Sequence, residues 1–260
     1  MFKKVKAIVK ENKEIAAQIY RMVLQCPDAD LANFVPGQFA NIAIPGHDEL
    51  LLKRPISIGT ADAGKQTVTL FYQIKGKGTN ALSGVLSGAK IDAIMPVGRG
   101  FNLKIAEKRI FLVGGGMGIA PLLTVTKKWP DKSYEAFLGH KGKDYVYCLS
   151  DFELLCEKIF VTSDDGTIGE KGFITDLVKK RLNEKKPDVV LACGPPMMLR
   201  TLREIIKPYG IAAQASMEQR MGCGFGACAT CACGVNTEDG PEYKKVCIEG
   251  PVFDLYEVML

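Results

Sequence analysis

The chain has 260 residues, of which 47% are hydrophobic and 24% charged, and its 34 basic and 29 acidic side chains give a formal net charge of +5. These proportions are typical of a globular protein and exclude a disordered chain, a collagen and a miniprotein held together by disulfides. The length is enough for one or two domains with a substantial hydrophobic core.

No export or membrane segment is expected. Residues 1–11 include basic residues, as an export signal does, but the charged Lys10 and Glu11 follow before an apolar export segment could form. The longest uncharged run, residues 110–126, is shorter than the ~20 apolar residues that cross a bilayer. Because the charges of both signs are mixed, the sequence predicts neither a nucleic-acid nor a membrane partner. We expect a cytoplasmic protein with reduced thiols.

The first part of the chain, residues 1–102, alternates short β-rich runs with glycine and proline. The pattern predicts a small antiparallel β-barrel domain. Its expected strands cover residues 5–9, 38–44, 56–60, 67–74 and 91–97.

Two segments of this part have side chains or free backbone amides that suit an anion. Residues 53–58 place the guanidinium of Arg54 near the hydroxyl of Ser57, which suits a pyrophosphate and the edge of a flavin ring. A surface arginine and a sheet serine are the alternative. Residues 76–80 precede a helix expected at 81–86, whose start either binds the same pyrophosphate or is an ordinary capped end.

The second part, residues 103–212, changes to alternating strands and helices. Apolar strands are expected at residues 109–113, 134–138, 158–162 and 189–193. Helices are expected after Gly118, Gly172 and Pro196. This alternation predicts a doubly wound α/β domain with a parallel sheet.

A glycine-rich turn follows the first strand of this domain. Residues 111–121 form a strand, a turn with Gly115, Gly116 and Gly118, and a helix start, the arrangement that binds dinucleotide phosphates. The strict fingerprint is absent, and residues 137–141 lack its acidic residue. We therefore favour a nicotinamide-nucleotide site of another α/β type over a structural turn.

The ends of two later strands bear on the same site. Cys193 and Gly194 end the fourth strand, where Cys193 either borders the nicotinamide or is a plain buried thiol. Asp164 and Asp165 follow the third strand and would repel a 2′-phosphate, which favours NAD over NADP. Lys141 is a nearby cation that argues the other way.

The third part, residues 213–260, holds the clearest motif. Cys223, Cys228 and Cys231 have the C-x4-C-x2-C spacing of a plant-type [2Fe-2S] cluster, with glycines between them that let the backbone approach sulfide. A zinc site is the alternative, although only one C-x2-C pair is present. Loop reach favours Cys247 over Cys233 as the fourth ligand.

The remaining candidate residues predict no hydrolytic site. We expect Cys26, Cys148 and Cys156 to be small buried hydrophobes, and His47 and His140 to be solvated. Glu218 and Arg220 are expected to form a solvated pair or a contact between domains. Four apolar residues of the third part either contact another protein or pack onto the chain itself: Met217, Met221, Phe225 and Phe253.

In this order, the motifs resemble those of the ferredoxin reductase superfamily, and more closely those of the electron-transfer subunits of two-subunit, NAD-dependent dihydroorotate dehydrogenases. The resemblance covers nearly the whole chain. Its most specific segments are residues 217–224 and 246–253, and the second identifies Cys247 as the fourth cluster ligand.

The resemblance implies an FAD site, in which Gln73 departs from the arginine expected at its position. The residues that would contact FAD are Arg54, Pro55, Ile56, Ser57, Phe71, Tyr72, Gln73, Gly78 and Thr79.

The resemblance also implies a hetero-oligomeric partner, an FMN-containing dihydroorotate dehydrogenase catalytic subunit of pyrimidine synthesis. Electrons would pass from that partner one at a time through [2Fe-2S], collect in pairs on FAD and leave as a hydride on NAD. One alternative is the small subunit of an electron-bifurcating transhydrogenase or sulfhydrogenase. A redox sensor or scaffold whose cluster never turns over is another.

Overall fold

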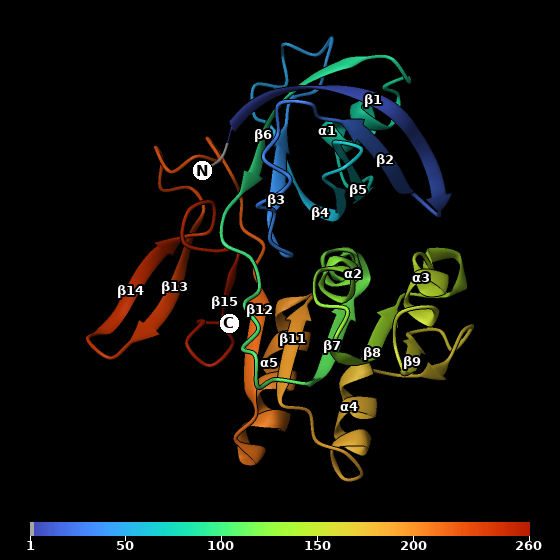
Figure 1. The fold of residues 1–260 in the computed structure, drawn as a ribbon, viewed down its shortest axis with the longest axis vertical. Helices are drawn as coiled ribbons and strands as arrows, with labels where there is room; N and C mark the ends of the chain where they lie inside the picture. Colours follow the sequence, from blue (N-terminus) through green and yellow to red (C-terminus); the bar gives the residue numbers. More distant parts are fainter. Residues whose placement is uncertain (1–2) are drawn as a thin grey trace.

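The computed structural model describes residues 3–260, and it contains a closed β-barrel, a seven-stranded sheet with helices on both faces, and a two-stranded hairpin (Figure 1). The barrel is at the top of Figure 1, the sheet lies below it, and the hairpin stands beside the sheet. The predicted combination of an antiparallel barrel and an α/β domain is confirmed.

The six barrel strands pair in the order β1-β2-β5-β4-β3-β6, and every neighbouring pair is antiparallel. The strands are β1 (Lys3–Ala16), β2 (Ile19–Gln25), β3 (Phe39–Ile42), β4 (Arg54–Asp62), β5 (Thr67–Gln73) and β6 (Lys90–Val97).

Strand β1 is longer than predicted, and β2 was not predicted. The first half of β1 alternates buried Val5, Ala7 and Val9 with exposed lysines, which is the pattern that sequence analysis detects. The second half is charged and has no buried face. It is held by pairing with β2 and by an ion pair between Glu11 and Arg21, whose Oε1 and Nε lie 2.8 Å apart.

The predicted helix at residues 81–86 begins earlier, as α1 (Lys77–Ser83). The cap residue is Gly76. The Thr79 hydroxyl accepts hydrogen bonds from the backbone amides of Lys75 (2.9 Å) and Gly76 (3.3 Å). Thr79 therefore fixes the turn between β5 and α1.

The larger sheet has the order β10-β9-β8-β7-β11-β12-β15, with every strand parallel to its neighbour except β15. Its strands are β7 (Arg109–Gly115), β8 (Ser133–His140), β9 (Lys158–Ser163), β10 (Glu170–Lys171), β11 (Val189–Cys193), β12 (Ala212–Ser216) and β15 (Val252–Asp254).

Helices cover both faces of this sheet, as predicted. Residues of α2 (Ile119–Lys128) and α3 (Leu149–Glu153) share one buried cluster with the sheet. Residues of α4 (Ile174–Leu182) and α5 (Pro196–Ile206) share the other. Strand order reverses between β7 and β11, so a crevice is expected at the carboxyl ends of these two strands.

The third part of the chain is built onto this sheet. The chain leaves the sheet at the end of β12, forms the hairpin β13 (Ala232–Thr237) and β14 (Gly240–Lys245), and returns as β15. The boundary expected after residue 212 therefore falls within β12. The division into three domains stays a prediction.

The three parts share buried interiors. Phe39 and Val97 of the barrel belong to the same buried cluster as Met221, Val246 and Cys247 of the third part. On the other face of the sheet, Ile19 and Phe71 of the barrel join the cluster that contains α2. The surfaces between the three parts are thus continuous hydrophobic cores.

A buried ion pair joins α4 to the sheet. Arg181 donates two hydrogen bonds to Glu135, from Nε (2.7 Å) and from Nη2 (2.8 Å), and the two side chains are 9% and 3% exposed. Burial raises the pKa of Glu135, but the hydrogen bonds from Arg181 and Lys185 outweigh it and leave that pKa below its ordinary value. Glu135 is therefore ionised inside the fold.

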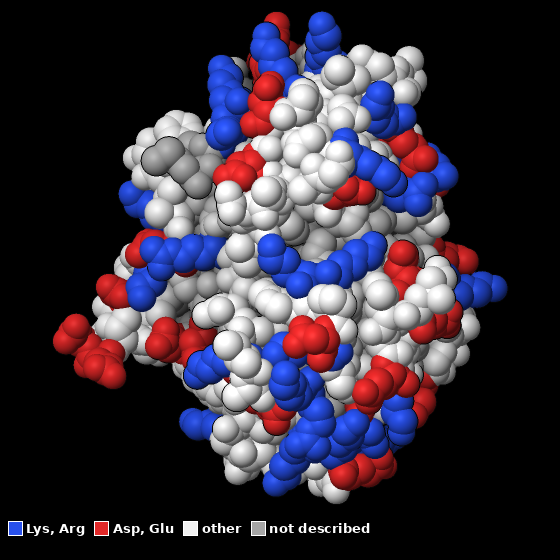
Figure 2. Space-filling view, in the orientation of Figure 1, with Lys and Arg blue, Asp and Glu red and all other residues white. Residues whose placement is uncertain are grey.

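The surface carries both charges close together (Figure 2). Around the end of α4, Lys180 pairs with Glu170 at 2.9 Å and Lys185 pairs with Glu157 at 3.4 Å. Among residues 3–260, no helix has the length and apolar composition needed to cross a membrane.

Replacing Arg181 by Met should lower the free energy of unfolding by about 3–5 kcal/mol, because the charge of Glu135 would lose its bidentate partner in a buried site. Lys180→Met, which breaks the exposed pair with Glu170, is the control and should cost at most about 1 kcal/mol. Urea unfolding measures both values, and equal losses would contradict the assignment. Because the folded-state pKa of Glu135 is lowered, the contribution of the pair is present above the ordinary value of 4.5 and disappears as the pH falls below it.

Candidate functional site

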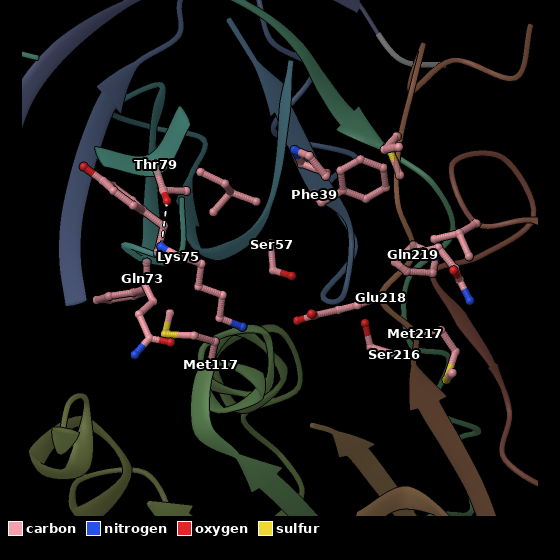
Figure 3. Close-up of a pocket in the computed structure, with 17 residues that line it drawn as sticks. Phe39, Ser57, Gln73, Lys75, Thr79, Met117, Ser216, Met217, Glu218 and Gln219 are labelled. Carbon is pink, nitrogen blue, oxygen red and sulfur yellow. Dashed lines mark hydrogen bonds between the residues drawn. The ribbon is translucent and has the colours of Figure 1, made fainter. Parts of the chain in front are cut away.

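A cavity of about 220 Å³, the central cavity, lies where the barrel, the sheet and the third part of the chain meet (Figure 3). Its walls are mostly apolar, and a few polar side chains project into it. The lining residues are Phe39, Pro55, Ile56, Ser57, Phe71, Tyr72, Gln73, Lys75, Thr79, Met117, Ser216, Met217, Glu218, Gln219, Met221, Val246 and Pro251.

The structure brings seven of the nine residues expected to contact FAD to this cavity, and places the other two, Arg54 and Gly78, against each other. A Cβ at residue 78 would overlap the guanidinium of Arg54, so only glycine allows this approach. Arg54 also donates a hydrogen bond to the carbonyl of Leu52. A fixed guanidinium beside the start of α1 suits a pyrophosphate.

The β5 wall of the cavity is held from behind by aromatic contacts. The Phe71 ring lies 5.6 Å from that of Tyr147, between ring centroids. Tyr72 stacks on Tyr20 at 5.5 Å, and its hydroxyl donates a hydrogen bond to Asn12 (2.8 Å). These two aromatic side chains are therefore rigid, and they give a flat ring system an apolar support.

The opposite wall contains residues that sequence analysis missed or interpreted differently. Met117 enters from the glycine-rich turn, and Ser216 and Met217 enter from the end of β12. Glu218 is exposed, in agreement with the expectation of a solvated residue, and its carboxylate also points into the cavity (Figure 3). Lys75 faces it from the barrel. Only the fold reveals these positions, because the segments are far apart in the sequence.

A second cavity of about 580 Å³, the edge cavity, lies along the carboxyl ends of the parallel strands. This is the crevice expected where strand order reverses. Its lining residues are Gly115, Gly116, Gly139, His140, Lys141, Thr162, Asp164, Gly172, Phe173, Ile174, Thr175, Asp176, Pro195, Met197, Met198 and Thr201.

The two turns predicted for nucleotide binding meet at this edge. A Cβ on Gly118 would overlap the backbone carbonyl of Cys193, and a Cβ on Gly194 would lie 3.1 Å from the backbone nitrogen of Gly115. Gly116 lines this cavity, has φ of +54° and has open space around its Cβ position, so no side chain separates its backbone from the cavity. Burial raises the pKa of the Cys193 thiol to about 12, which keeps it neutral.

Tyr147 holds the glycine-rich turn, a role that sequence analysis did not detect. Its hydroxyl lies 3.1 Å from the carbonyl oxygens of both Gly116 and Met117 and donates to them. Its ring contacts Phe71 on the barrel. One buried side chain therefore links the turn at the edge cavity to a strand of the central cavity.

Two expectations about the ends of β8 and β9 need correction. His140 was expected to be solvated but is 4% exposed, and within the described chain neither ring nitrogen has a hydrogen-bond partner. Of the two carboxylates after β9, only Asp164 lines the edge cavity. Asp165 accepts hydrogen bonds from the amide (2.9 Å) and hydroxyl (2.6 Å) of Thr167. Lys141 lines the cavity as well.

The cysteines of the third part form two pairs. Sγ of Cys223 lies 3.4 Å from Sγ of Cys228, and Sγ of Cys231 lies 3.3 Å from Sγ of Cys247. Cys233 instead directs its thiol to the carbonyl of Gly234 at 3.8 Å. Within residues 3–260 no three His, Cys, Asp or Glu side chains converge on a position for a single metal ion. Two pairs of thiols suit two metal ions better than one.

The loop around these thiols is fixed to the rest of the chain. The side-chain amide of Asn41, on β3, donates to the carbonyl of Cys223 (3.2 Å), and a Cβ on Gly224 would overlap that amide. Lys245 donates to the carbonyl of Gly226 (2.8 Å). The barrel and the hairpin together position the loop.

The thiols differ in how readily they ionise. Hydrogen bonds from the backbone of Cys223 and from Thr230 lower the pKa of Cys228 to about 6. Burial and the neighbouring Cys231 raise the pKa of Cys247 to about 12, so its thiolate needs a metal ion to form. All nine cysteines are free. Of the three expected to be buried hydrophobes, Cys26 is buried, and Cys148 and Cys156 are half-buried.

Comparison with known proteins agrees with this geometry. Residues 218–259 match the family described as the iron-sulfur cluster binding domain of dihydroorotate dehydrogenase B. The electron transfer subunit of dihydroorotate dehydrogenase B (NAD(+)) from Caldanaerobacter subterraneus subsp. tengcongensis is 38% identical over 256 residues, which cover 98% of each chain. The corresponding subunit of Bacillus cereus is 39% identical over 265 residues, covering all of both chains.

Solved structures agree on the fold. An NADH-dependent reduced ferredoxin-NADP oxidoreductase, studied for flavin-based electron bifurcation, aligns with a TM-score of 0.85 and 26% identity over 97% of this chain and 89% of that chain. Ferredoxin-NADP+ reductase from Plasmodium falciparum aligns with a TM-score of 0.62 and 15% identity over 78% of this chain and 89% of its own. The chain therefore belongs to the family of electron transfer subunits of the NAD-dependent dihydroorotate dehydrogenase B, and it has the fold of ferredoxin reductases.

Proposed function

We propose that this chain carries electrons from the FMN-containing catalytic subunit of dihydroorotate dehydrogenase through a [2Fe-2S] cluster and FAD to NAD, in the pyrimidine synthesis of the cytoplasm. One observation carries the proposal. The central cavity is lined by Met117 from the nucleotide turn on one side and by Met221 and Val246 from the cysteine segment on the other. A flavin in this cavity would adjoin both redox partners.

The central cavity fits FAD. When bound there, FAD supplies the exchange between the one-electron chemistry of a cluster and the two-electron chemistry of NAD. Arg54 would bind the pyrophosphate at the start of α1, beside Gly78 and Thr79. Ser57 and Gln73 offer polar contacts at the cavity wall.

The edge cavity fits a nicotinamide nucleotide. Gly115 and Gly116 line this cavity, and the open space at Gly116 would leave room for the phosphates. Gly118 would hold the turn against Cys193, and Cys193 and Gly194 would border the nicotinamide. Asp164 lies on the cavity wall and would repel a 2′-phosphate, so NAD is proposed over NADP. Lys141, on the same wall, lies with its ammonium 5.1 Å from the centre of the Tyr145 ring and is the cation that would favour NADP instead.

The two pairs of cysteines fit a binuclear cluster. Two sulfurs bound to one tetrahedral metal ion at ~2.3 Å lie about 3.8 Å apart, close to the separations in both pairs. Cys223 with Cys228 would bind one iron, and Cys231 with Cys247 the other. The thiol of Cys233 is directed to the carbonyl of Gly234 and not to the other thiols, which supports Cys247 as the fourth ligand.

The surface beside the cluster loop supports a docking role for this segment. Three of the four apolar residues singled out from the sequence, Met217, Met221 and Phe253, are buried in the chain itself. Phe225 is 44% exposed, and Ile248, which lies against the following residue, Gly226, is 37% exposed. These two side chains would meet the catalytic subunit, which supplies the base and the FMN that oxidise dihydroorotate.

The second candidate is a small subunit of a bifurcating transhydrogenase, favoured by the structural match with a TM-score of 0.85. The relatives that are 38% to 39% identical over the whole chain favour the dihydroorotate dehydrogenase assignment.

Serine substitution should separate the cluster ligands from the neighbouring thiol. Cys247→Ser, like Cys223→Ser, Cys228→Ser and Cys231→Ser, should abolish the visible absorbance of the cluster, because a thiolate ligand is lost. Cys233→Ser is the matched control, since Cys233 is buried nearby and should leave iron content unchanged. Iron analysis after anaerobic purification measures the effect. Full iron in Cys247→Ser and none in Cys233→Ser would show that the fourth ligand is wrongly assigned.

Arg54→Ala should weaken FAD binding by about tenfold to a hundredfold, since a charge-assisted hydrogen bond contributes about 1.5–3 kcal/mol. Lys53→Ala removes the neighbouring charge and should have little effect. Equilibrium dialysis followed by flavin absorbance gives the dissociation constants. An unchanged constant for Arg54→Ala would exclude the pyrophosphate contact.

Reconstitution tests the whole assignment. Alone, the chain should reduce artificial acceptors with NADH but should not oxidise dihydroorotate, because it supplies neither FMN nor a catalytic base. Co-expressed with an FMN-containing dihydroorotate dehydrogenase subunit from the same source, it should co-elute and confer dihydroorotate-dependent NAD reduction. Separate elution without coupled activity would refute the proposed function, and a clear preference for NADPH would favour the transhydrogenase.

A further inference from the structure

Lys75 places a positive charge on the wall of the central cavity. Among the described residues that line this cavity, Lys75 is the only Lys or Arg and Glu218 is the only carboxylate. Lys75 follows the end of β5, and the bond from its backbone amide to Thr79 (2.9 Å) fixes the start of its side chain. The cavity therefore has one cation and one anion on opposite walls.

The side chain of Lys75 points away from the pyrophosphate end. Figure 3 shows its amine directed into the cavity, away from Thr79 and toward the space between Ser57, Met117 and Glu218. Arg54 lies beside Gly78, at the start of α1. Arg54 and Lys75 would therefore lie at different ends of FAD, Arg54 at the pyrophosphate and Lys75 at the flavin ring.

The end that Lys75 faces is where charge would change during the reaction. Hydride transfer from NADH to the flavin breaks the C–H bond of the dihydronicotinamide, forms a bond to the flavin, and releases NAD⁺. Both electrons and the hydrogen move together, so the flavin gains one negative charge. A nearby cation stabilises this reduced form over the neutral oxidised ring, and a nearby carboxylate destabilises it.

We propose that Lys75 contacts the flavin ring and selectively stabilises its reduced, anionic form. The inference rests on the proposed binding of FAD in this cavity. Gln73 lines the same wall two residues earlier in the chain, where side chains of an extended segment share a face, but it is neutral. Lys75 thus supplies the charge that Gln73 does not.

The test compares the two-electron midpoint potential of the flavin in the holo chain and in Lys75→Gln, by spectroelectrochemistry. Lys75→Gln should weaken the binding of reduced flavin relative to oxidised flavin about tenfold, which lowers the potential by about 30 mV. Lys65→Gln, which changes an 81% exposed lysine outside the cavity and away from α1, should leave the potential unchanged. Glu218→Gln should shift it in the opposite direction, which a merely structural role would not produce.

A rescue variant sharpens the test. Gln73→Arg combined with Lys75→Gln returns a cation to the same wall and should restore most of the potential. Equal potentials in Lys75→Gln and Lys65→Gln, with FAD retained, would overturn the assignment of Lys75 alone. Loss of oxidised FAD from Lys75→Gln would also overturn it, because the proposed effect is selective for the reduced form. A wild-type chain that binds no FAD would instead refute the proposed function.

Discussion

Helix α2 packs between the barrel and the sheet, and the arrangement of the central and edge cavities depends on this contact. Residues 119–126 of α2 are all buried, and its apolar side chains share a core with Ile19 and Phe71 of the barrel. The helix begins directly after Gly118, so the contact that buries it also places the glycine-rich turn beside the barrel. Each Å² of apolar surface buried in this contact stabilises it by ~25 cal/mol. The contact therefore holds the barrel and the sheet together, unlike a mobile hinge.

The cysteine segment is attached on the other side of the same junction. Strands β12 and β15 pair with each other at the edge of the sheet, so both ends of the segment are fixed. Asn41 of the barrel holds the loop at Cys223. The loop is therefore anchored by the sheet at its ends and by the barrel near its first cysteine. A fixed loop keeps a constant distance to the central cavity, which electron transfer requires.

Much of the architecture could be predicted from the sequence, because its signals are local. Apolar runs at residues 109–113 and 189–193 lie within β7 and β11, and the glycines between 114 and 118 mark the turn that must approach Cys193. The spacing of the cysteines is likewise local. Local patterns did not predict the second half of β1, because it has no buried face. They also did not predict where α1 begins, because its cap is Gly76, which has no side chain to signal a cap.

The walls of the cavities could not be predicted in the same way. Lys75, Tyr147 and Glu218 are ordinary polar residues in the sequence, and their positions follow only from how barrel, sheet and cysteine segment meet. His140 shows the same limit, since it follows the strand predicted at residues 134–138 but is the last residue of β8 and is buried. Tertiary contacts determine the environment of such residues, whereas hydrophobic periodicity predicts where strands and helices form.

The central claim is that the flavin exchanges electrons with both NAD and the cluster inside one chain. An anaerobic titration of the purified holo chain with NADH, followed by visible absorbance and electron paramagnetic resonance, tests it most directly. The account predicts that the chain accepts about three electrons, two on the flavin and one on the cluster, and that the signal of a reduced [2Fe-2S] cluster appears. A flavin that bleaches fully while the cluster stays oxidised, even with excess NADH, would contradict it.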